Sequence, residues 1–258
     1  MEKVISSDGT TIAFDRSGDG PPVVLVCGGS TDRKANAPLA ALLEDRLTVF
    51  NYDRRGRGDS GDTAPYAVLR EVEDIEAVIT AAGGSACVFG TSSGAALALE
   101  AAAAGLRIRK LALWEPPFVI DESRRPPADT AKVYTDLVAA GRRGDAVAYF
   151  MSKVVGMPDE FVAQARNAPF WQEQEALAHT LAYDAAVMAD YSVPTQRAAQ
   201  VTTPTLVIAG GADFPWMPET ARRLADAVPN GETRRLEGQG HNVNPAVLAP
   251  VLKDFFAG

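Results

Sequence analysis

The chain has 258 residues, of which 47% are hydrophobic and 22% charged, so it can bury the core of one domain that carries an inserted subdomain. Its formal net charge of −8 disfavours nucleic acid and anionic membranes as partners, because both favour a basic face. The start lacks an apolar signal region, and no uncharged stretch of about 18 residues could span a bilayer. We therefore expect a small-molecule substrate, no nucleic acid and no membrane; a homo-oligomer stays open.

The two cysteines predict the compartment. Cys27 and Cys87 end or lie within apolar runs that have the pattern of adjacent strands. Buried thiols fit this placement better than the disulfide framework of a secreted protein does. The expected location is a reducing cytoplasm.

An alternating pattern of strands and helices predicts an α/β fold. Strands at residues 3–6 and 10–16 flank the turn signal Ser7-Asp8-Gly9, which predicts an antiparallel hairpin at one edge of a sheet. Apolar runs then alternate with amphipathic stretches, as in a buried parallel sheet covered by helices. Further strands are expected at 23–27, 48–52, 86–89, 110–114, 205–209 and 233–237, and helices at 35–45, 67–81, 95–104, 219–228 and from Asn244 onward through or around Pro250.

The alternation is interrupted after Trp114. Glu115-Pro116-Pro117 ends a strand, and the following residues supply only helical patterns until the strand at 205. Helices are expected at 129–140, 145–155, 159–166 and 172–190. The predicted organisation is an α/β core over residues 1–118 and 200–258 and a helical cap over residues 119–199.

A candidate nucleophile lies where the strand at 86–89 meets an alanine-rich helix. The motif Gly90-Thr91-Ser92-Ser93-Gly94 has the form G-x-S-x-G in the strand–turn–helix context that a nucleophile elbow requires. The turn lifts the Ser92 hydroxyl clear of the sheet, and the two glycines let strand and helix pack closely. The sequence predicts Ser92 as a nucleophile.

A serine nucleophile needs an imidazole base and a carboxylate that orients it. His241 follows a predicted strand in a glycine-rich loop, whereas His179 lies inside a predicted cap helix, so His241 is the expected base. Asp213 is the expected carboxylate, because it follows the preceding strand and gives the chain order Ser, Asp, His. Glu115 and Asp121, after the strand before that, are the substitutes.

Two loops near these strands are rich in glycine. Gly28-Gly29-Ser30-Thr31 follows a strand and could bring backbone N–H groups close to a ligand as half of an oxyanion hole, or could be only a tight turn. The segment from Tyr52 to Ser60 is dense in glycine and charge, which predicts a loop and suggests no function by itself.

In combination, these motifs resemble the α/β-hydrolase superfamily, in its branch of capped serine hydrolases that holds esterases, lactonases and cofactor-free perhydrolases. The matching stretches are G-T-S-S-G at 90–94, the D-x-R-G-x-G-x-S loop at 53–60, E-P-P at 115–117, G-x-x-D ending at Asp213 and G-H ending at His241. The resemblance implies an eight-stranded, mostly parallel sheet with a helical cap. It also implies an oxyanion hole made by the backbone N–H groups of Gly29 and Ser93. Relatives usually carry His-Gly where this chain has Cys27-Gly28, so a polar anchor of the oxyanion loop is missing.

The expected activity is hydrolysis of a small, fairly apolar ester, thioester or lactone through an acyl-enzyme on Ser92. No metal or organic cofactor is expected, because the two histidines and two cysteines do not stand at ligand spacing. Two alternatives stay open. The same triad serves perhydrolysis, C–C bond hydrolysis or a lyase or cyclase step in this superfamily, and a non-catalytic relative could keep the pocket for ligand binding.

Overall fold

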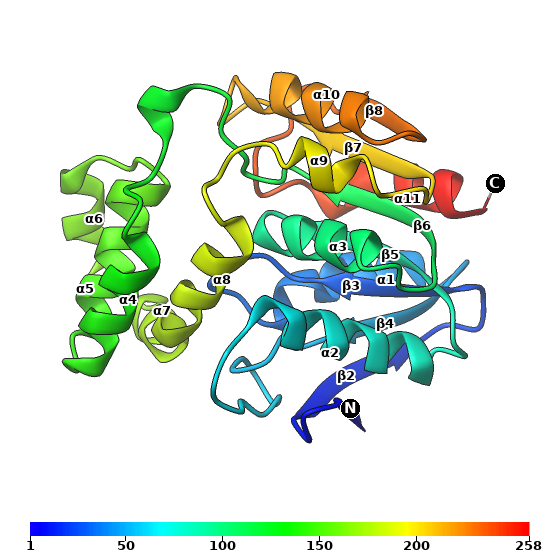
Figure 1. Ribbon diagram of the computed structural model, residues 1–258, viewed down its shortest axis with the longest axis horizontal. Helices are drawn as coiled ribbons and strands as arrows, with labels where there is room; N and C mark the ends of the chain where they lie inside the picture. The colour runs from blue at the N-terminus through cyan, green and yellow to red at the C-terminus, as the bar shows by residue number, and fades with distance from the viewer. Residues whose placement is uncertain (258) are drawn as a thin grey trace.

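The structure, a computed structural model, describes residues 1–257. In that part of the chain eight strands form one sheet in the order β1-β2-β4-β3-β5-β6-β7-β8 (Figure 1). The β1–β2 and β2–β4 pairs are antiparallel and the remaining pairs are parallel, which confirms the predicted edge hairpin and mostly parallel sheet. The strands are β1 (Glu2–Ile5), β2 (Thr11–Ser17), β3 (Pro22–Val26), β4 (Thr48–Tyr52), β5 (Ala86–Thr91), β6 (Ile108–Trp114), β7 (Thr205–Ala209) and β8 (Gly231–Arg235).

Helices cover both faces of the sheet (Figure 1). Successive side chains of a strand point to opposite faces, so a central strand buried on both sides is apolar at every position. In β3, Val24 and Val26 pack in the apolar cluster that includes the helices α2, α3 and α10, whereas Val23 and Leu25 pack with α1 and α11. These helices are α1 (Ala37–Leu43), α2 (Val68–Ala81), α3 (Ser93–Ala103), α10 (Met217–Ala227) and α11 (Pro245–Ala257).

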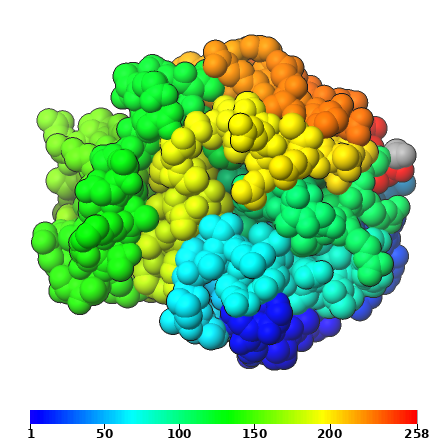
Figure 2. All heavy atoms as spheres, viewed as in Figure 1, coloured from blue at the N-terminus to red at the C-terminus, as the bar shows by residue number. Residues whose placement is uncertain are grey.

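The chain between β6 and β7 forms a separate group of helices beyond the carboxyl ends of the parallel strands (Figure 1). Several of them enclose an apolar cluster of their own that includes Tyr134, Val147 and Trp171. One helix, α8, also packs against α2 and α3, and Figure 2 shows this part of the chain lying against the loop that precedes α2. The helices of this group are α4 (Thr130–Ala139), α5 (Arg143–Tyr149), α6 (Asp159–Ala165), α7 (Trp171–Leu177) and α8 (Leu181–Met188), whereas α9 (Thr195–Ala198) lies against α3 and α10 of the core.

The predicted boundaries differ from the observed ones mainly in this helical segment. The helix expected at 145–155 is α5 followed by a π-helical turn over Phe150–Val154, and the helix expected at 172–190 is divided by the 3-10 turn Ala178–Thr180 into α7 and α8. The sequence pattern does not predict α9, β8 begins two residues before the predicted strand, and α11 continues through Pro250. Within residues 1–257, no helix combines the length and the apolar character needed to cross a bilayer.

Candidate active site

Ser92 occupies a sharp turn between β5 and α3. Its backbone is left-handed, with φ 56° and ψ −126°, a conformation that costs free energy for a residue with a side chain and is held here by the elements on both sides. A Cβ atom on Gly90 would collide with the backbone of Gly94 and Ala95, and one on Gly94 would collide with the carbonyl oxygen of Cys27. The two glycines of the motif are therefore required by close packing.

A cavity of about 580 Å³ opens at Ser92. His241 lines the same cavity, together with apolar side chains from the core and from the helices between β6 and β7. Such a shape, concave and mainly apolar with a few polar groups, is typical of small-molecule sites. The apolar lining includes Leu39, Phe150, Met157, Met188, Trp216 and Leu248.

The imidazole of His241 contacts Glu115. Nδ1 of His241 lies 2.8 Å from Oε2 of Glu115, whose side chain is 1% exposed. The other carboxylate oxygen, Oε1, accepts hydrogen bonds from the backbone N–H groups of Gly210 (3.0 Å) and Gly211 (3.1 Å) at the end of β7. Glu115 directly follows β6 and has φ 40°, so strained backbone occurs at this residue as it does at Ser92.

The expectation that Asp213 orients the imidazole is corrected by this geometry. Oδ2 of Asp213 accepts a hydrogen bond from the backbone N–H of His241 at 2.8 Å, so Asp213 holds the loop that carries the histidine and Glu115 holds its ring. The reason lies in the arrangement of the strands and the length of the side chain. Glu115 directly follows β6, which neighbours β7 in the sheet, and its side chain, longer than that of an aspartate, reaches across the end of β7 to the imidazole. Asp121, the other substitute, caps a 3-10 turn at Ser123 on the surface.

His179 has different neighbours. Its Nδ1 lies 3.1 Å from Nη2 of Arg143 and its Nε2 lies 3.9 Å from a carboxylate oxygen of Asp62. Burial, reinforced by the nearby arginine charge, lowers the pKa of His179 below its usual value. Among the described residues that line the cavity at Ser92, His241 is present and His179 is not.

The loop after β3 passes next to Ser92. A Cβ on Gly28 would lie 3.1 Å from Cβ of Ser92, and one on Gly29 would lie 3.4 Å from Oγ of Ser93. Nη1 of Arg57 donates a hydrogen bond to the carbonyl oxygen of Gly28 at 2.6 Å. Because C=O and N–H point in opposite directions in a trans peptide, this bond turns the N–H of Gly29 away from Arg57. Ser93 is the first residue of α3, so its N–H has no partner within the helix.

Cys27 directly follows β3 and contributes one hydrogen bond to this loop. Its thiol is fully buried, its Sγ lies 3.5 Å from the carbonyl oxygen of Thr31, and burial raises its pKa. Cys87 is also buried and free, as predicted. Arg57 and Gln174 of α7 also hold the loop. The side chain of Gln174 accepts a hydrogen bond from Oγ of Ser30 and donates one to the carbonyl oxygen of Ser30 at 3.1 Å.

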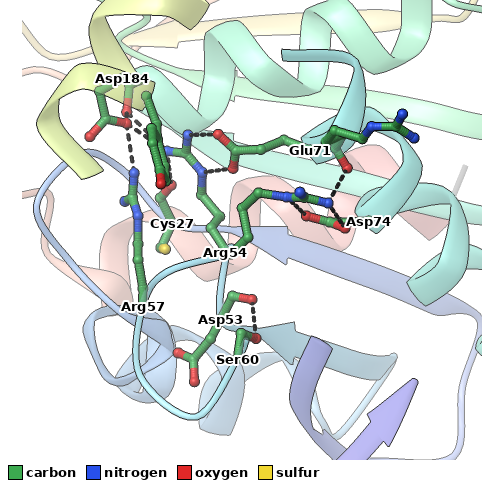
Figure 3. A network of polar contacts seen from close by, with 12 residues as sticks. Cys27, Asp53, Arg54, Arg57, Ser60, Glu71, Asp74 and Asp184 are labelled. Atoms are coloured by element: carbon green, nitrogen blue, oxygen red, sulfur yellow. Dashed lines mark hydrogen bonds and ion pairs between the residues drawn. The ribbon is translucent and has the colours of Figure 1, made fainter. Parts of the chain in front are cut away.

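An ionic network lies behind the loop (Figure 3). Arg54 donates to both carboxylate oxygens of Glu71, at 2.7 and 2.8 Å, and to Oδ1 of Asp184 at 2.8 Å. Arg57 and Oγ of Ser93 donate to the same Oδ1, at 2.8 and 2.7 Å. Burial alone raises the pKa of Asp184, but the charges of Arg57 and Arg54 outweigh it, so the pKa lies below its usual value. Asp184 therefore ties α8 to the elbow.

The sequence pattern does not reveal this network. It predicts a loop of obscure function from Tyr52 to Ser60, yet Arg54, Arg55 and Arg57 are at most 1% exposed. The only feature of the sequence that points to the network is the number of charged residues in this loop. Asp184 gives no such signal, because its partner Arg54 is 130 residues away in the chain.

Comparisons with known proteins show the family to which this fold belongs. A family model described as Alpha/beta hydrolase family matches residues 23–251. The crystal structure of an alpha/beta hydrolase from Sphaerobacter thermophilus is 56% identical, covers 99% of this chain and 100% of that one, and superposes with a TM-score of 0.92.

Two curated relatives are more distant. A polyketide synthase, ThaQ, of Burkholderia thailandensis is 28% identical over 91% of this chain, and the chain spans 12% of its length. A protein named as a carbamate hydrolase, RutD, of Pseudomonas savastanoi pv. phaseolicola is 27% identical over 92% of this chain and 94% of its own length.

Proposed function

The chain belongs to the α/β hydrolase family and is a hydrolase, and from this premise we propose that it cleaves a small, fairly apolar ester, thioester or lactone through an acyl-enzyme on Ser92. One observation carries the proposal: the strained elbow at Ser92 and the imidazole of His241, which Glu115 holds from behind, line one mainly apolar cavity. In this proposal residues 119–199 act as a cap over that cavity.

The chemistry follows from the groups present. His241 takes the hydroxyl proton of Ser92 as Oγ attacks the carbonyl carbon, and Glu115 holds the imidazole in the tautomer whose Nε2 can accept that proton. The N–H groups of Gly29 and Ser93 stabilise the oxyanion. The imidazolium then protonates the leaving oxygen or sulfur as its bond to the carbonyl carbon breaks. Water, deprotonated by His241, hydrolyses the acyl-enzyme and regenerates Ser92.

The experiment is a chain-length series of p-nitrophenyl esters, from acetate to laurate, on the wild type and on Ser92→Ala. A cavity of about 580 Å³ favours short and medium acyl chains, and the variant is expected to lose turnover with all of them. A fluorophosphonate probe is expected to label the wild type and not the variant. Activity that persists in folded Ser92→Ala, or no labelling of Ser92 beside a labelled control esterase, would refute the proposal.

A carbamate is a second substrate candidate, because one relative is named as a carbamate hydrolase. With an aryl carbamate, the same acyl transfer would release the phenol and leave a carbamoyl group on Ser92, which water would hydrolyse to a carbamic acid that loses carbon dioxide to give the amine. Adding a p-nitrophenyl N-alkylcarbamate to the ester series tests this candidate. A kcat/KM for the carbamate above that of every ester would support it, and slow stoichiometric inactivation in place of turnover would exclude it.

A further inference from the structure

Resting on this proposed function, we infer that Oδ2 of Asp184 binds a neutral hydrogen-bond donor, such as a hydroxyl group, on the acyl part of the substrate. The inference names a recognition element within the cavity of Ser92. It starts from the unequal use of the two oxygens of one carboxylate.

Oδ1 of Asp184 accepts three hydrogen bonds, from Arg54, Arg57 and Ser93, at 2.7 to 2.8 Å. Oδ2 is buried and has no hydrogen-bond partner in the described protein. The side chain is 10% exposed, and Asp184 is one of the residues that line the cavity. Figure 3 shows one carboxylate oxygen turned away from the arginines. A buried carboxylate oxygen without a donor is costly, so a ligand that supplies one gains binding free energy.

Gly29 lies directly beside Oδ2. A Cβ at Gly29 would lie 3.1 Å from Oδ2, closer than an ordinary contact, so the absence of a side chain lets the loop approach this oxygen closely. Gly29 is also the residue whose N–H is proposed to bind the substrate carbonyl oxygen. A substrate whose carbonyl oxygen binds there would place the nearby substituents of its acyl part close to Oδ2.

The charges around Asp184 select a neutral donor. Arg54 and Arg57 face Glu71 and Asp184, so two guanidinium groups balance two carboxylates and no net negative charge remains for a cation. The carboxylate is ionised, because its pKa is lowered by the arginines against the effect of burial, and an ionised carboxylate only accepts hydrogen bonds.

The donor belongs to the acyl part. The leaving group lies beside His241, which protonates it, whereas Asp184 borders the proposed oxyanion donors at Gly29 and Ser93. Hydroxyl groups at the second or third carbon of the acid are therefore the best candidates.

The test compares methyl esters of butyric acid with their 2-hydroxy, 3-hydroxy, 2-methoxy and 3-methoxy derivatives, followed by titration of the released acid. A methoxy group keeps the oxygen and cannot donate. We expect at least one hydroxy ester to have a kcat/KM about ten- to a hundredfold above its methoxy partner, the range for a hydrogen bond to a charged group. Hydrolysis of butyrate without a preference for either hydroxy ester overturns the inference and leaves the proposed function intact; no hydrolysis of any ester refutes the function itself.

Two variants assign the effect to the cavity oxygen. Asp184→Asn is expected to lose the hydroxyl preference. Glu71→Gln is the matched control, because it removes a carboxylate from the same arginine but not from the cavity wall, and it is expected to keep the preference. A preference unchanged in Asp184→Asn overturns the inference.

A structure keeps the inference testable if Asp184→Asn does not fold. Wild-type protein is crystallised after reaction with an alkylphosphonate whose chain carries the preferred hydroxyl group. The expected result is a hydroxyl oxygen within hydrogen-bond distance of Oδ2, about 2.5 to 3.0 Å for an O–H donor. A hydroxyl group that binds elsewhere overturns the assignment.

Discussion

Replacing Glu115 and Asp213 one at a time distinguishes the carboxylate that holds the ring of His241 from the one that holds its backbone. Glu115→Gln and Asp213→Asn keep the size of each side chain and remove its charge. The structure predicts unequal effects, because Oε2 of Glu115 lies 2.8 Å from Nδ1 and Oδ2 of Asp213 lies 2.8 Å from the backbone nitrogen of His241.

The magnitude follows from proton placement. The glutamine oxygen of Glu115→Gln can keep the hydrogen bonds from Gly210 and Gly211, which turns its NH₂ group toward Nδ1 of His241. The ring must then carry its proton on Nε2, the nitrogen that has to accept the proton of Ser92. In a serine triad this change of tautomer lowers kcat about 10⁴-fold, or about 5 kcal/mol. The side chain introduced by Asp213→Asn would keep an oxygen for the N–H of His241, so we expect this variant to lose activity by less than about tenfold, as for one neutral hydrogen bond.

The assay is kcat/KM for p-nitrophenyl butyrate across pH, with urea unfolding of each variant to establish that it is folded. The reasoning is refuted if folded Asp213→Asn loses as much activity as Glu115→Gln. It is also refuted if Glu115→Gln stays within about tenfold of the wild type, because a tautomer change costs far more.

Three further outcomes follow from packing and burial. Gly94→Ala is expected to lower the free energy of unfolding in urea by at least about 1 to 3 kcal/mol, because its Cβ would collide with the carbonyl oxygen of Cys27. In Gly61→Ala the Cβ would lie 3.5 Å from its neighbours, so this control is expected to be nearly neutral, and equal losses in the two variants would contradict the prediction. Burial alone raises the pKa of Asp184, but the arginine charges outweigh burial, so the pKa in the folded protein is lowered. The contribution of the ionised Asp184 to stability is therefore complete above the pKa of an unfolded aspartate, about 3.9, and is lost as the pH falls toward the pKa in the folded protein. The difference in free energy of unfolding between the wild type and Asp184→Asn should decrease as the pH is lowered, and a difference that increases would contradict the lowered pKa. Cys27 and Cys87 are at most 2% exposed and burial raises the pKa of both, so a thiol reagent is expected to label them in denaturant and not in the native protein; rapid native labelling would contradict their burial.

Local patterns in the sequence predict the sheet and the elbow well. Strands of four or five apolar residues are short enough to be recognised individually, and G-x-S-x-G owes its glycines to contacts with neighbouring residues of the turn or with the adjacent strand. The carboxylate partner of His241 is a different problem. Glu115 and Asp213 both follow strands, and the choice between them depends on a left-handed φ at Glu115 and on how far each side chain reaches, neither of which is encoded in spacing.

The buried arginines illustrate the other limit. Charged residues in a glycine-rich segment are normally solvated, so a loop on the surface is the natural interpretation of residues 52–60. Burial of Arg54 and Arg57 is stable only because Asp184 and Glu71 balance them, and those partners come from α8 and α2. A pairing between residues so far apart in the chain cannot be predicted from the local sequence pattern.

The link between Asp184 and the two arginines holds α8 in place beside the cavity. Separating α8 from the elbow would remove a carboxylate partner from both Arg54 and Arg57, and breaking a buried pair of this kind costs about 3 to 5 kcal/mol. Gln174 similarly fastens α7 to Ser30. α8 contributes Asp184 and Met188 to the lining of the cavity, so this wall of the cavity is costly to move.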